Sequence, residues 1–316
     1  MPATTGCLLA LALAGALPAE AQGTLARVRA ENTLRCAAEP RPGFADAEED
    51  GRIIGLTVDL CRAVAIAVIG PAARVEVSLV EAETAFDPLR QAAVDLAFLV
   101  PAAVVEHRLG PFLIPGPLVF IDPIAAMVPA ASDAQSVSDL AGRTVCLMIG
   151  SAGQRALEAT LDTTRITVSR LAFGEDVEML DAYNVGQCEA VVDHATRLAR
   201  MRRTSGINHL RSRILDPPLA LTPVFGFTPV SDGAWAALVS WTLQLLITEG
   251  ERTSPWRATA TPSGDMRLGW LTEVQAAVGT YAAMRDRHLG ARSPLGLPAW
   301  PNAPWPQGLL PRLLFD

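Results

Sequence analysis

The sequence predicts an α/β protein of two lobes with a cleft between them, and three observations favour this fold class. Strand-like and helix-like segments alternate along the chain, and the alternation restarts after a polar stretch at 129–142. Extended segments near 124–132 and 218–228 then connect the two units. Alternating strands and helices indicate a parallel or mixed sheet covered by helices. Two connecting strands leave a cleft between the units, a common place for small-molecule sites.

The composition supports a large folded core and excludes several classes of protein. Of 316 residues, 50% are hydrophobic and 19% are charged, which excludes global disorder. The formal net charge is -7, and every basic residue is a scattered Arg, since the chain contains no Lys. An acidic chain without a basic stripe is not expected to bind nucleic acid.

The first 21 residues have the pattern of a secretory signal peptide. An apolar core runs from Cys7 to Leu17, and Ala19 and Ala21 match an A-x-A cleavage site. We therefore expect the mature chain to begin at Gln22. The apolar core is too short to span a bilayer, so the mature protein is expected to be exported and soluble.

Four cysteines remain after that cleavage, namely Cys36, Cys61, Cys146 and Cys188. An even number in an exported chain favours two disulfides. Four cysteines allow three pairings, and sequence order favours Cys36–Cys61 and Cys146–Cys188. The alternative is four buried free thiols. No His lies at metal-ligand spacing beside these cysteines, so no metal site is expected.

Hydrophobic periodicity assigns the elements of the first unit. The period of 3.6 over Leu56–Val68 predicts a helix, which Gly70 and Pro71 end. The remaining elements follow in order: a strand at 33–38, a loop at 39–52, a strand at 75–80, a short helix at 86–95 and a strand at 96–100.

The second unit repeats this order, and the chain then returns to the first unit. The expected elements are strands at 144–149, 166–173 and 188–193 and helices at 150–161, 175–187 and 194–203, followed by an extended segment at 219–227 and a helix at 232–249. The predicted organisation is a signal peptide at 1–21, a first lobe that begins with 22–127, a second lobe at 128–218, and a return to the first lobe with a C-terminal helical extension at 219–316.

Five short stretches, in this order, carry a family resemblance: TLRCAAEPRPGF, GLTVDLCRAVAIAVIG, RTVCLMIGSAG, GQCEAVVDH and SPLGLPAWPNAPWPQGLL. The chain resembles the periplasmic amino-acid-binding proteins of ABC importers, in particular the general L-amino-acid (AapJ-type) branch of solute-binding family 3. The resemblance covers nearly the whole mature chain, and the four cysteines lie where that branch has its own. It implies a type II periplasmic-binding-protein fold with an interlobe cleft and a two-strand hinge.

A cleft that binds an amino acid must compensate both charges of a zwitterion. Gly150 to Gly153 follow a strand and open a helix, and the family has Gly followed by Thr or Ser at this place. The resemblance therefore implies that Ser151 and Gly153 contact the ligand with backbone N–H groups at a helix N-terminus. The alternative is an ordinary turn in which Ser151 only caps the helix.

The family places an Asp, which accepts the ligand ammonium, at the end of the strand after the fourth Cys. An ungapped alignment puts His194 there and Asp193 one residue earlier. A shift of one residue turns a strand side chain to the opposite face, but Asp193 can still serve if the strand ends early. The alternatives are Asp193 as the N-cap of the helix at 194–203 and His194 as a surface residue.

The largest departure from the family lies at 98–108. The branch has a polar run here, followed by an Arg that binds the ligand carboxylate, whereas this chain has the apolar run Phe98–Ala103. The Arg position falls on His107, with Arg108 one residue later, and Arg108 takes the role if its length compensates. The alternative is that residues 106–108 form a solvated face. Thr57 and Ile53–Ile54 also replace family residues. Phe44 either stacks on the ligand or packs in the core.

The expected function is an extracytoplasmic solute-binding protein of the periplasm. It captures an amino acid or related small molecule and presents it to an inner-membrane ABC permease as a monomer. The first alternative is a degenerate homologue that acts as a sensor or accessory protein. The second is a dehydratase-type enzyme, for which a Glu106/His107 acid–base pair is the single hint. No cofactor is expected, and an enzyme is not the favoured interpretation.

Overall fold

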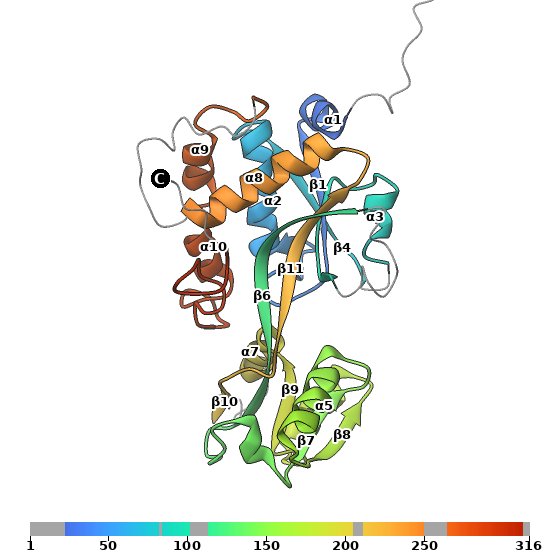
Figure 1. Ribbon diagram of the computed structural model, residues 1–316, viewed down its shortest axis with the longest axis vertical. Helices are drawn as coiled ribbons and strands as arrows, with labels where there is room; N and C mark the ends of the chain where they lie inside the picture. The colour runs from blue at the N-terminus through green and yellow to red at the C-terminus, as the bar shows by residue number, and fades with distance from the viewer. Residues whose placement is uncertain (1–22, 82–83, 102–112, 205–210, 250–263, 312–316) are drawn as a thin grey trace, which may run out of the picture.

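The computed structural model describes residues 23–81, 84–101, 113–204, 211–249 and 264–311. Two lobes lie along the long axis of the molecule, and two long strands, β6 (Leu113–Pro129) and β11 (Ala220–Pro229), run between them (Figure 1). The signal peptide predicted at 1–21 lies outside the described residues. Within the described residues, no helix is long and apolar enough to cross a membrane.

The two lobes share one hydrogen-bonded sheet. Over the described residues this sheet has nine strands, in the order β4-β1-β5-β11-β6-β9-β7-β8, with β10 paired to β6. Strands β1, β4 and β5 are parallel in the first lobe, as are β7, β8 and β9 in the second. β6 and β11 are antiparallel to each other and join the two parallel parts. This arrangement is the predicted two-lobe α/β fold with a two-strand hinge.

The elements of the first lobe begin at the N-terminus and include the returning C-terminal part of the chain. They are α1 (Thr24–Glu31), β1 (Thr33–Ala38), β2 (Asp46–Ala47), β3 (Ile53–Ile54), α2 (Leu56–Val68), β4 (Arg74–Leu79), α3 (Asp87–Arg90), β5 (Leu96–Leu99), α8 (Gly233–Glu249), α9 (Trp270–Ala277) and α10 (Tyr281–His288).

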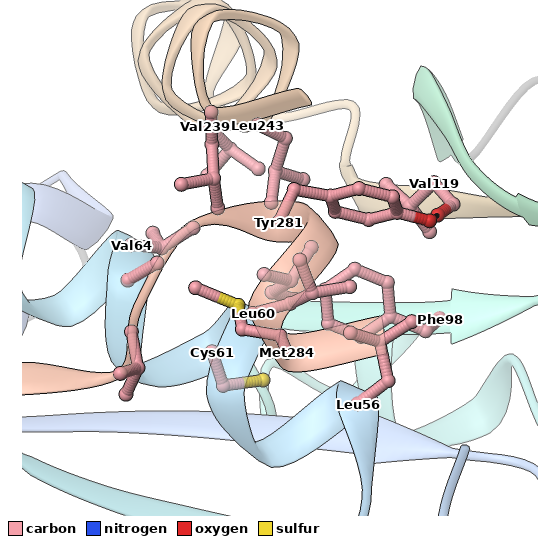
Figure 2. Packing of buried hydrophobic residues seen from close by; sticks show 14 of the residues in the cluster. Leu56, Leu60, Cys61, Val64, Phe98, Val119, Val239, Leu243, Tyr281 and Met284 are labelled. Atoms are coloured by element: carbon pink, nitrogen blue, oxygen red, sulfur yellow. Dashed lines mark hydrogen bonds between the residues drawn. The ribbon is translucent and has the colours of Figure 1, made fainter. Parts of the chain in front are cut away.

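Helices cover both faces of the first lobe's sheet. Alternate residues of β1 point to opposite sides, so that Leu34 and Cys36 join the larger core with α2, α8, α9 and α10, while Ala37 joins a smaller core with α3. Figure 2 shows Leu60 of α2 and Tyr281 of α10 within the larger core. The Tyr281 hydroxyl donates to the Val119 carbonyl of β6 at 2.7 Å, which ties α10 to the hinge.

The second lobe is smaller and has helices on both faces of its three parallel strands. Its elements are η3 (Val137–Leu140), β7 (Thr144–Met148), α5 (Ala152–Thr164), β8 (Ser169–Phe173), α6 (Asp176–Asn184), β9 (Ala190–His194), α7 (Ala195–Thr204) and β10 (Ser212–Ile214). Residues of α5 pack on one face, and residues of α6 and α7 pack on the other.

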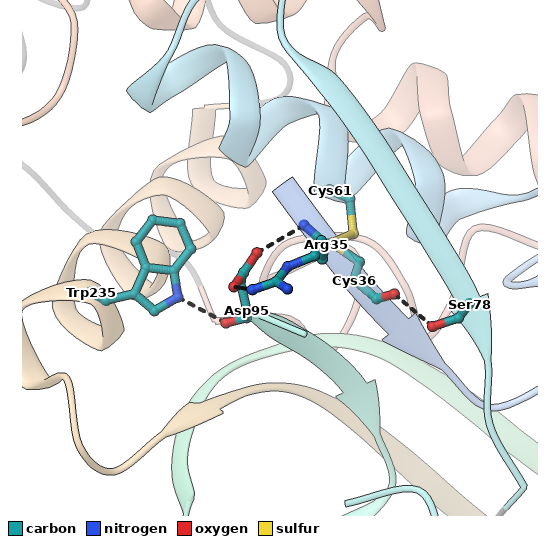
Figure 3. Close-up of a disulfide and its surroundings, with 6 residues drawn as sticks. All are labelled: Arg35, Cys36, Cys61, Ser78, Asp95 and Trp235. Carbon is teal, nitrogen blue, oxygen red and sulfur yellow. Dashed lines mark hydrogen bonds and ion pairs between the residues drawn. A yellow bond between two sulfur atoms is a disulfide. The ribbon is translucent and has the colours of Figure 1, made fainter. Parts of the chain in front are cut away.

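The structure forms both disulfides that sequence order favours. Cys36 of β1 bonds Cys61 of α2, with 6.6 Å between their Cα atoms, and Cys146 of β7 bonds Cys188, with 5.7 Å. Figure 3 shows the first of them beside the buried Asp95, which accepts from the Arg35 backbone N–H at 2.9 Å. Each disulfide therefore links a strand of one lobe to a segment packed against it.

Most predicted helices and strands are present, with two differences. The helix predicted at 86–95 is a single turn, α3, because Ala92 adopts a positive φ of 54° and ends it. The extended segment predicted near 124–132 lies largely within the 17-residue β6, which contains Pro115, Pro117, Pro123 and Pro129. The lobe boundaries at 127 and 218 stay a prediction.

Candidate functional site

A cavity of about 270 Å³ lies between the two lobes. The loop after β1 forms one wall, and α6, the end of β9 and α7 form the other. Its charged lining residues are Asp46, Asp176, Asp193, Arg41, Arg197 and Arg200, and its other lining residues are Pro40, Pro42, Val177, Leu180 and Met201. The lining therefore offers three carboxylates, three guanidinium groups and an apolar wall.

Asp193 is the most unusual group in this interlobe pocket. Its side chain is 6% exposed, and its Oδ1 accepts a hydrogen bond from the His194 backbone N–H at 2.7 Å. Its Oδ2 is buried and has no hydrogen-bond partner among the described residues. A buried carboxylate oxygen without a donor is costly, so Asp193 has room for a hydrogen-bond donor that the described residues do not supply.

Arg197 is the nearest cation to that oxygen. It lies one helical turn after Asp193, and its Nη1 is 3.9 Å from Asp193 Oδ2 and 3.4 Å from both carboxylate oxygens of Asp176. Strong charge-assisted N–H···O bonds are roughly 2.7–2.9 Å long, so these contacts are loose. The Arg197 side chain is 45% exposed, which leaves it free to reorient.

The lobes are joined across the pocket by two sets of charged contacts. Arg200 of α7 forms an ion pair with Asp46 of β2. Asp122 of β6 is fully buried and accepts from Arg41 Nη1 at 2.7 Å and from the Thr196 hydroxyl at 2.7 Å. Asp122 Oδ1 also accepts from the Thr196 backbone N–H at 3.2 Å, so it caps α7 from another strand.

His194 lies at the hinge and not on the surface. It pairs with Ile124 of β6, and its Nε2 is 3.2 Å from the hydroxyl oxygen of Thr222 of β11. Strand β9 extends to His194, and α7 begins at Ala195. The structure therefore places Asp193 inside the strand, and the helix cap that the sequence suggested for it is supplied by Asp122.

The turn from β7 into α5 contains Ser151 and Gly153. The Ser151 hydroxyl accepts from the Gln154 backbone N–H at 3.1 Å, so Ser151 does cap α5. The Gly150 N–H donates to the Gln154 side chain at 2.8 Å. A Cβ on Gly153 would lie 2.8 Å from the Val192 carbonyl oxygen, so glycine is needed for α5 to pack against β9. Contact of these residues with a ligand stays a prediction.

Phe44 belongs to the core of the first lobe. It is 1% exposed, its ring stacks on Phe120 at 5.0 Å between centroids, and it meets Phe98 edge to face at 6.3 Å. The ring therefore has the packing role, and in this structure it does not face the pocket. Thr57 is also fully buried, in the first turn of α2.

The structure describes the first part of the apolar run that replaces the family's polar residues. Phe98 and Leu99 end β5 as core residues with 1% and 0% exposure. Arg108, with Glu106 and His107, lies outside the described residues. Its predicted contact with the ligand carboxylate therefore stays a prediction.

Apart from Asp193, the charged residues that line this pocket escaped the sequence analysis, Arg41 and Arg197 among them. Asp122, the buried partner of Arg41, escaped it as well. Asp122 carried a usable signal, because it is a lone carboxylate inside the apolar stretch that became β6. A buried charge normally needs a partner, and arginine is its usual one. Arg197 carried a weaker signal, since it follows Asp193 at the i,i+4 spacing that brings helix side chains together.

A larger cavity of about 770 Å³ lies behind the hinge, between β6, the segment 213–218 and the C-terminal tail. Several of its polar wall groups are engaged by the protein. Arg202 donates to the Leu295 carbonyl at 3.0 Å, and Asn302 exchanges two hydrogen bonds of 2.7 Å with the Ile121 backbone. Asp193 Oδ2 has no such partner, so the interlobe pocket is the better candidate for ligand binding.

No protein-family model matches the sequence. The chain is similar over nearly its whole length to two curated relatives. It is 24% identical to the putative amino-acid ABC transporter-binding protein YhdW of Escherichia coli strain K12, over 94% of this chain and 93% of that protein. It is also 24% identical to the general L-amino acid-binding periplasmic protein AapJ of Rhizobium johnstonii, over 95% and 94%.

A solved structure has the same fold. It is the ABC transporter periplasmic binding protein from Brucella ovis with glutathione bound, with a TM-score of 0.73 and 22% identity, covering 91% of this chain and 97% of that one. The chain is therefore similar in sequence, along nearly its whole length, to amino-acid-binding proteins of ABC importers, and it shares the two-lobed fold of a periplasmic binding protein.

Proposed function

We propose that this protein is an extracytoplasmic solute-binding protein that captures an amino acid or a related small molecule for an ABC importer. The observation that carries the proposal is the buried Asp193 Oδ2, which lacks a hydrogen-bond partner among the described residues and lines the pocket between the lobes. The ammonium group of an amino acid supplies the missing donor and the opposite charge.

Binding in this proposal is a conformational event without chemistry. The two lobes are connected by β6 and β11, so they can rotate about the hinge and enclose the ligand. The ligand shifts the population toward the enclosed state because it contacts both walls there. The relatives' names describe binding proteins and not enzymes, which supports a non-enzymatic role.

The same comparison supports the setting of this proposal, in which the protein acts in the periplasm and delivers its ligand to an inner-membrane ABC permease. Its export by a signal peptide and its monomeric state stay predictions. The small pocket volume favours a small ligand, because pockets for drug-sized molecules span roughly 300–1,000 Å³.

The test is a ligand screen by thermal shift on the chain from Gln22. The panel holds the twenty L-amino acids, glutathione and several apolar carboxylic acids, with calorimetry on each hit. A ligand at a hundred times its Kd that binds only the folded state stabilises it by about 2.7 kcal/mol. We expect Asp193→Asn to weaken the hit roughly 10- to 100-fold, since it removes a charge-assisted hydrogen bond.

Asp181→Asn is the matched control, because Asp181 is an exposed carboxylate of α6 outside the pocket. It is expected to leave the affinity unchanged. If no compound in the panel stabilises the protein, amino-acid capture is refuted, and the alternative of a non-transport homologue becomes the favoured one. If a hit binds Asp193→Asn as tightly as the parent protein, the site is elsewhere.

A further inference from the structure

The pocket must also compensate the carboxylate of an amino acid, and its three arginines differ in how strongly they are engaged. Arg41 is held by the buried Asp122 at 2.7 Å, and Arg200 is paired with Asp46. Within the part of the chain that the structure describes, Arg197 has only the loose contacts of 3.4 Å to Asp176 and 3.9 Å to Asp193. Among these three cations, Arg197 therefore has the donors most readily transferred to a ligand.

We propose that Arg197 holds the carboxylate of the ligand, so that the end of β9 and the first turns of α7 bind the whole zwitterionic head. This inference rests on the proposed function and deepens it. It moves the carboxylate site from the segment after β5, where the family has its Arg, to a helix of the second lobe.

The geometry of the two groups suits an α-amino acid. Asp193 Oδ2 and Arg197 Nη1 lie 3.9 Å apart, so an acceptor and a donor stand side by side. The ammonium and carboxylate of an α-amino acid are likewise adjacent, and the zwitterion can insert with each charge against its opposite. A neutral ion pair then receives a neutral zwitterion, and no net charge is buried when the lobes close.

Asp176 is a weak competitor for Arg197. Its side chain is 61% exposed, and an exposed ion pair contributes little free energy in water. The ligand carboxylate is enclosed between the lobes, where the same guanidinium interaction is less screened. Arg197 is therefore expected to exchange Asp176 for the ligand carboxylate at small cost.

The remaining wall indicates the class of side chain. Pro40 and Pro42 of the first lobe face Val177, Leu180 and Met201 of the second across the same pocket. Val177 is 70% exposed, although its position at the start of α6 does not require an apolar residue. An apolar ligand side chain would cover this surface and gain its burial. The ligand class is therefore an α-amino acid with a small apolar side chain.

The experiment compares the twenty L-amino acids with their α-carboxamides, which keep the ammonium and neutralise the carboxylate. Titration calorimetry is run on the parent protein, Arg197→Gln and Arg170→Gln. Arg170 is a comparable control, since it is 51% exposed and forms an ion pair with Glu158 outside the pocket. We expect the parent protein and Arg170→Gln to prefer the free carboxylate roughly 10-fold or more.

Arg197→Gln is expected to weaken binding of the amino acid roughly 10- to 100-fold and to change the affinity for the carboxamide less than about threefold. The preference for the free carboxylate is then lost. Asp176→Asn removes the carboxylate that competes for Arg197, so it is expected to raise the affinity for the amino acid about two- to fivefold. This second variant moves affinity in the opposite direction, which loss of folding cannot mimic.

The outcomes separate this inference from the proposed function. If Arg197→Gln binds amino acids but keeps the parent's preference over carboxamides, Arg197 does not hold the carboxylate, and the proposed function stands. An Asp176→Asn variant that binds no more tightly than the parent counts against the exchange of partners. If the parent protein binds neither amino acids nor carboxamides, both proposals fall together.

Discussion

Removal of the Asp122 carboxylate should destabilise the protein more than removal of any exposed carboxylate. Asp122 is 0% exposed on β6 and receives hydrogen bonds from Arg41 and from both donors of Thr196. It thus links the loop after β1 in the first lobe to the N-terminus of α7 in the second. We consider the substitution Asp122→Ala.

The magnitude follows from what the substitution leaves behind. The Arg41 side chain is 10% exposed, and its other carboxylate, Glu39, lies 3.8 Å away. Breaking a buried ion pair by removing one partner costs about 3–5 kcal/mol. The contact with Glu39 offsets part of this, so we expect a loss of about 3 kcal/mol in the free energy of unfolding. Asp122→Asn keeps one acceptor oxygen and is expected to lose about 1.5–3 kcal/mol.

The assay is urea unfolding with both disulfides intact, followed by circular dichroism. Asp87→Asn is the control, because Asp87 and Arg90 form an ion pair in which both side chains are 44% exposed. Exposed pairs contribute about 0–1 kcal/mol. An Asp122→Ala protein within 1 kcal/mol of the parent would refute the view that Asp122 compensates a buried charge.

Three further predictions concern other parts of the fold. Burial raises the pKa of Tyr281, so its phenol stays neutral in the folded state, whereas the unfolded chain ionises it near pH 10. The free energy of unfolding is therefore unaffected by this group below about pH 10. Above that pH it falls by up to about 1.4 kcal/mol per pH unit. The chain has no Lys and one other Tyr, whose pKa burial also raises, so Tyr281→Phe should reduce this alkaline slope in urea unfolding at several pH values. An unchanged slope would contradict the assignment of the slope to Tyr281. Gly153→Ala places a methyl group 2.8 Å from a carbonyl oxygen of β9 and should cost about 1–3 kcal/mol, measured as a lower urea midpoint, whereas an unchanged midpoint would mean that α5 shifts freely. Asn302→Ala leaves a buried N–H and C=O of β6 without partners and should cost about 2–4 kcal/mol, with faster hydrogen exchange at the Ile121 amide as the local readout; protected exchange would show that the tail is not what covers this edge.

Local patterns predicted much of the fold because they act over a few residues. The helix Leu56–Val68 has the predicted bounds, since its apolar periodicity and the following Gly70 and Pro71 act within one segment. Sequence order also favoured the disulfide pairs that form, because each joins a strand to a nearby segment of the same lobe.

The hinge strand was the main element that these patterns missed. Proline is normally disfavoured inside a strand, so the four prolines of β6 hid most of its length. Its long pairing with β11, from Leu113 to Ile124, compensates them. This pairing joins residues about a hundred positions apart in the chain, and no local pattern reports it.

The site was harder to predict than the fold, because its contacts depend on register and on distant segments. Asp193 was identified as a candidate in case its strand ended early, but β9 continues to His194. Its Oδ2 is instead left without a donor inside β9. Phe44 illustrates the opposite error, since a loop aromatic looked available for stacking and is enclosed by two other rings. A sequence shows that an aromatic residue exists, but only the fold decides which surface it covers.

One more experiment tests how Asp122 stabilises the fold. A lone carboxylate in an apolar strand implies a distant partner, and the structure identifies Arg41, 81 positions earlier. If the ion pair dominates, Arg41→Met combined with Asp122→Leu removes both charges and should be more stable than Asp122→Ala alone. If the double variant is no more stable, the unpaired charge is not the main cost. The lost cap of α7 at Thr196 would then account for the destabilisation. In that case Asp122 stabilises the fold chiefly by linking the hinge to the second lobe.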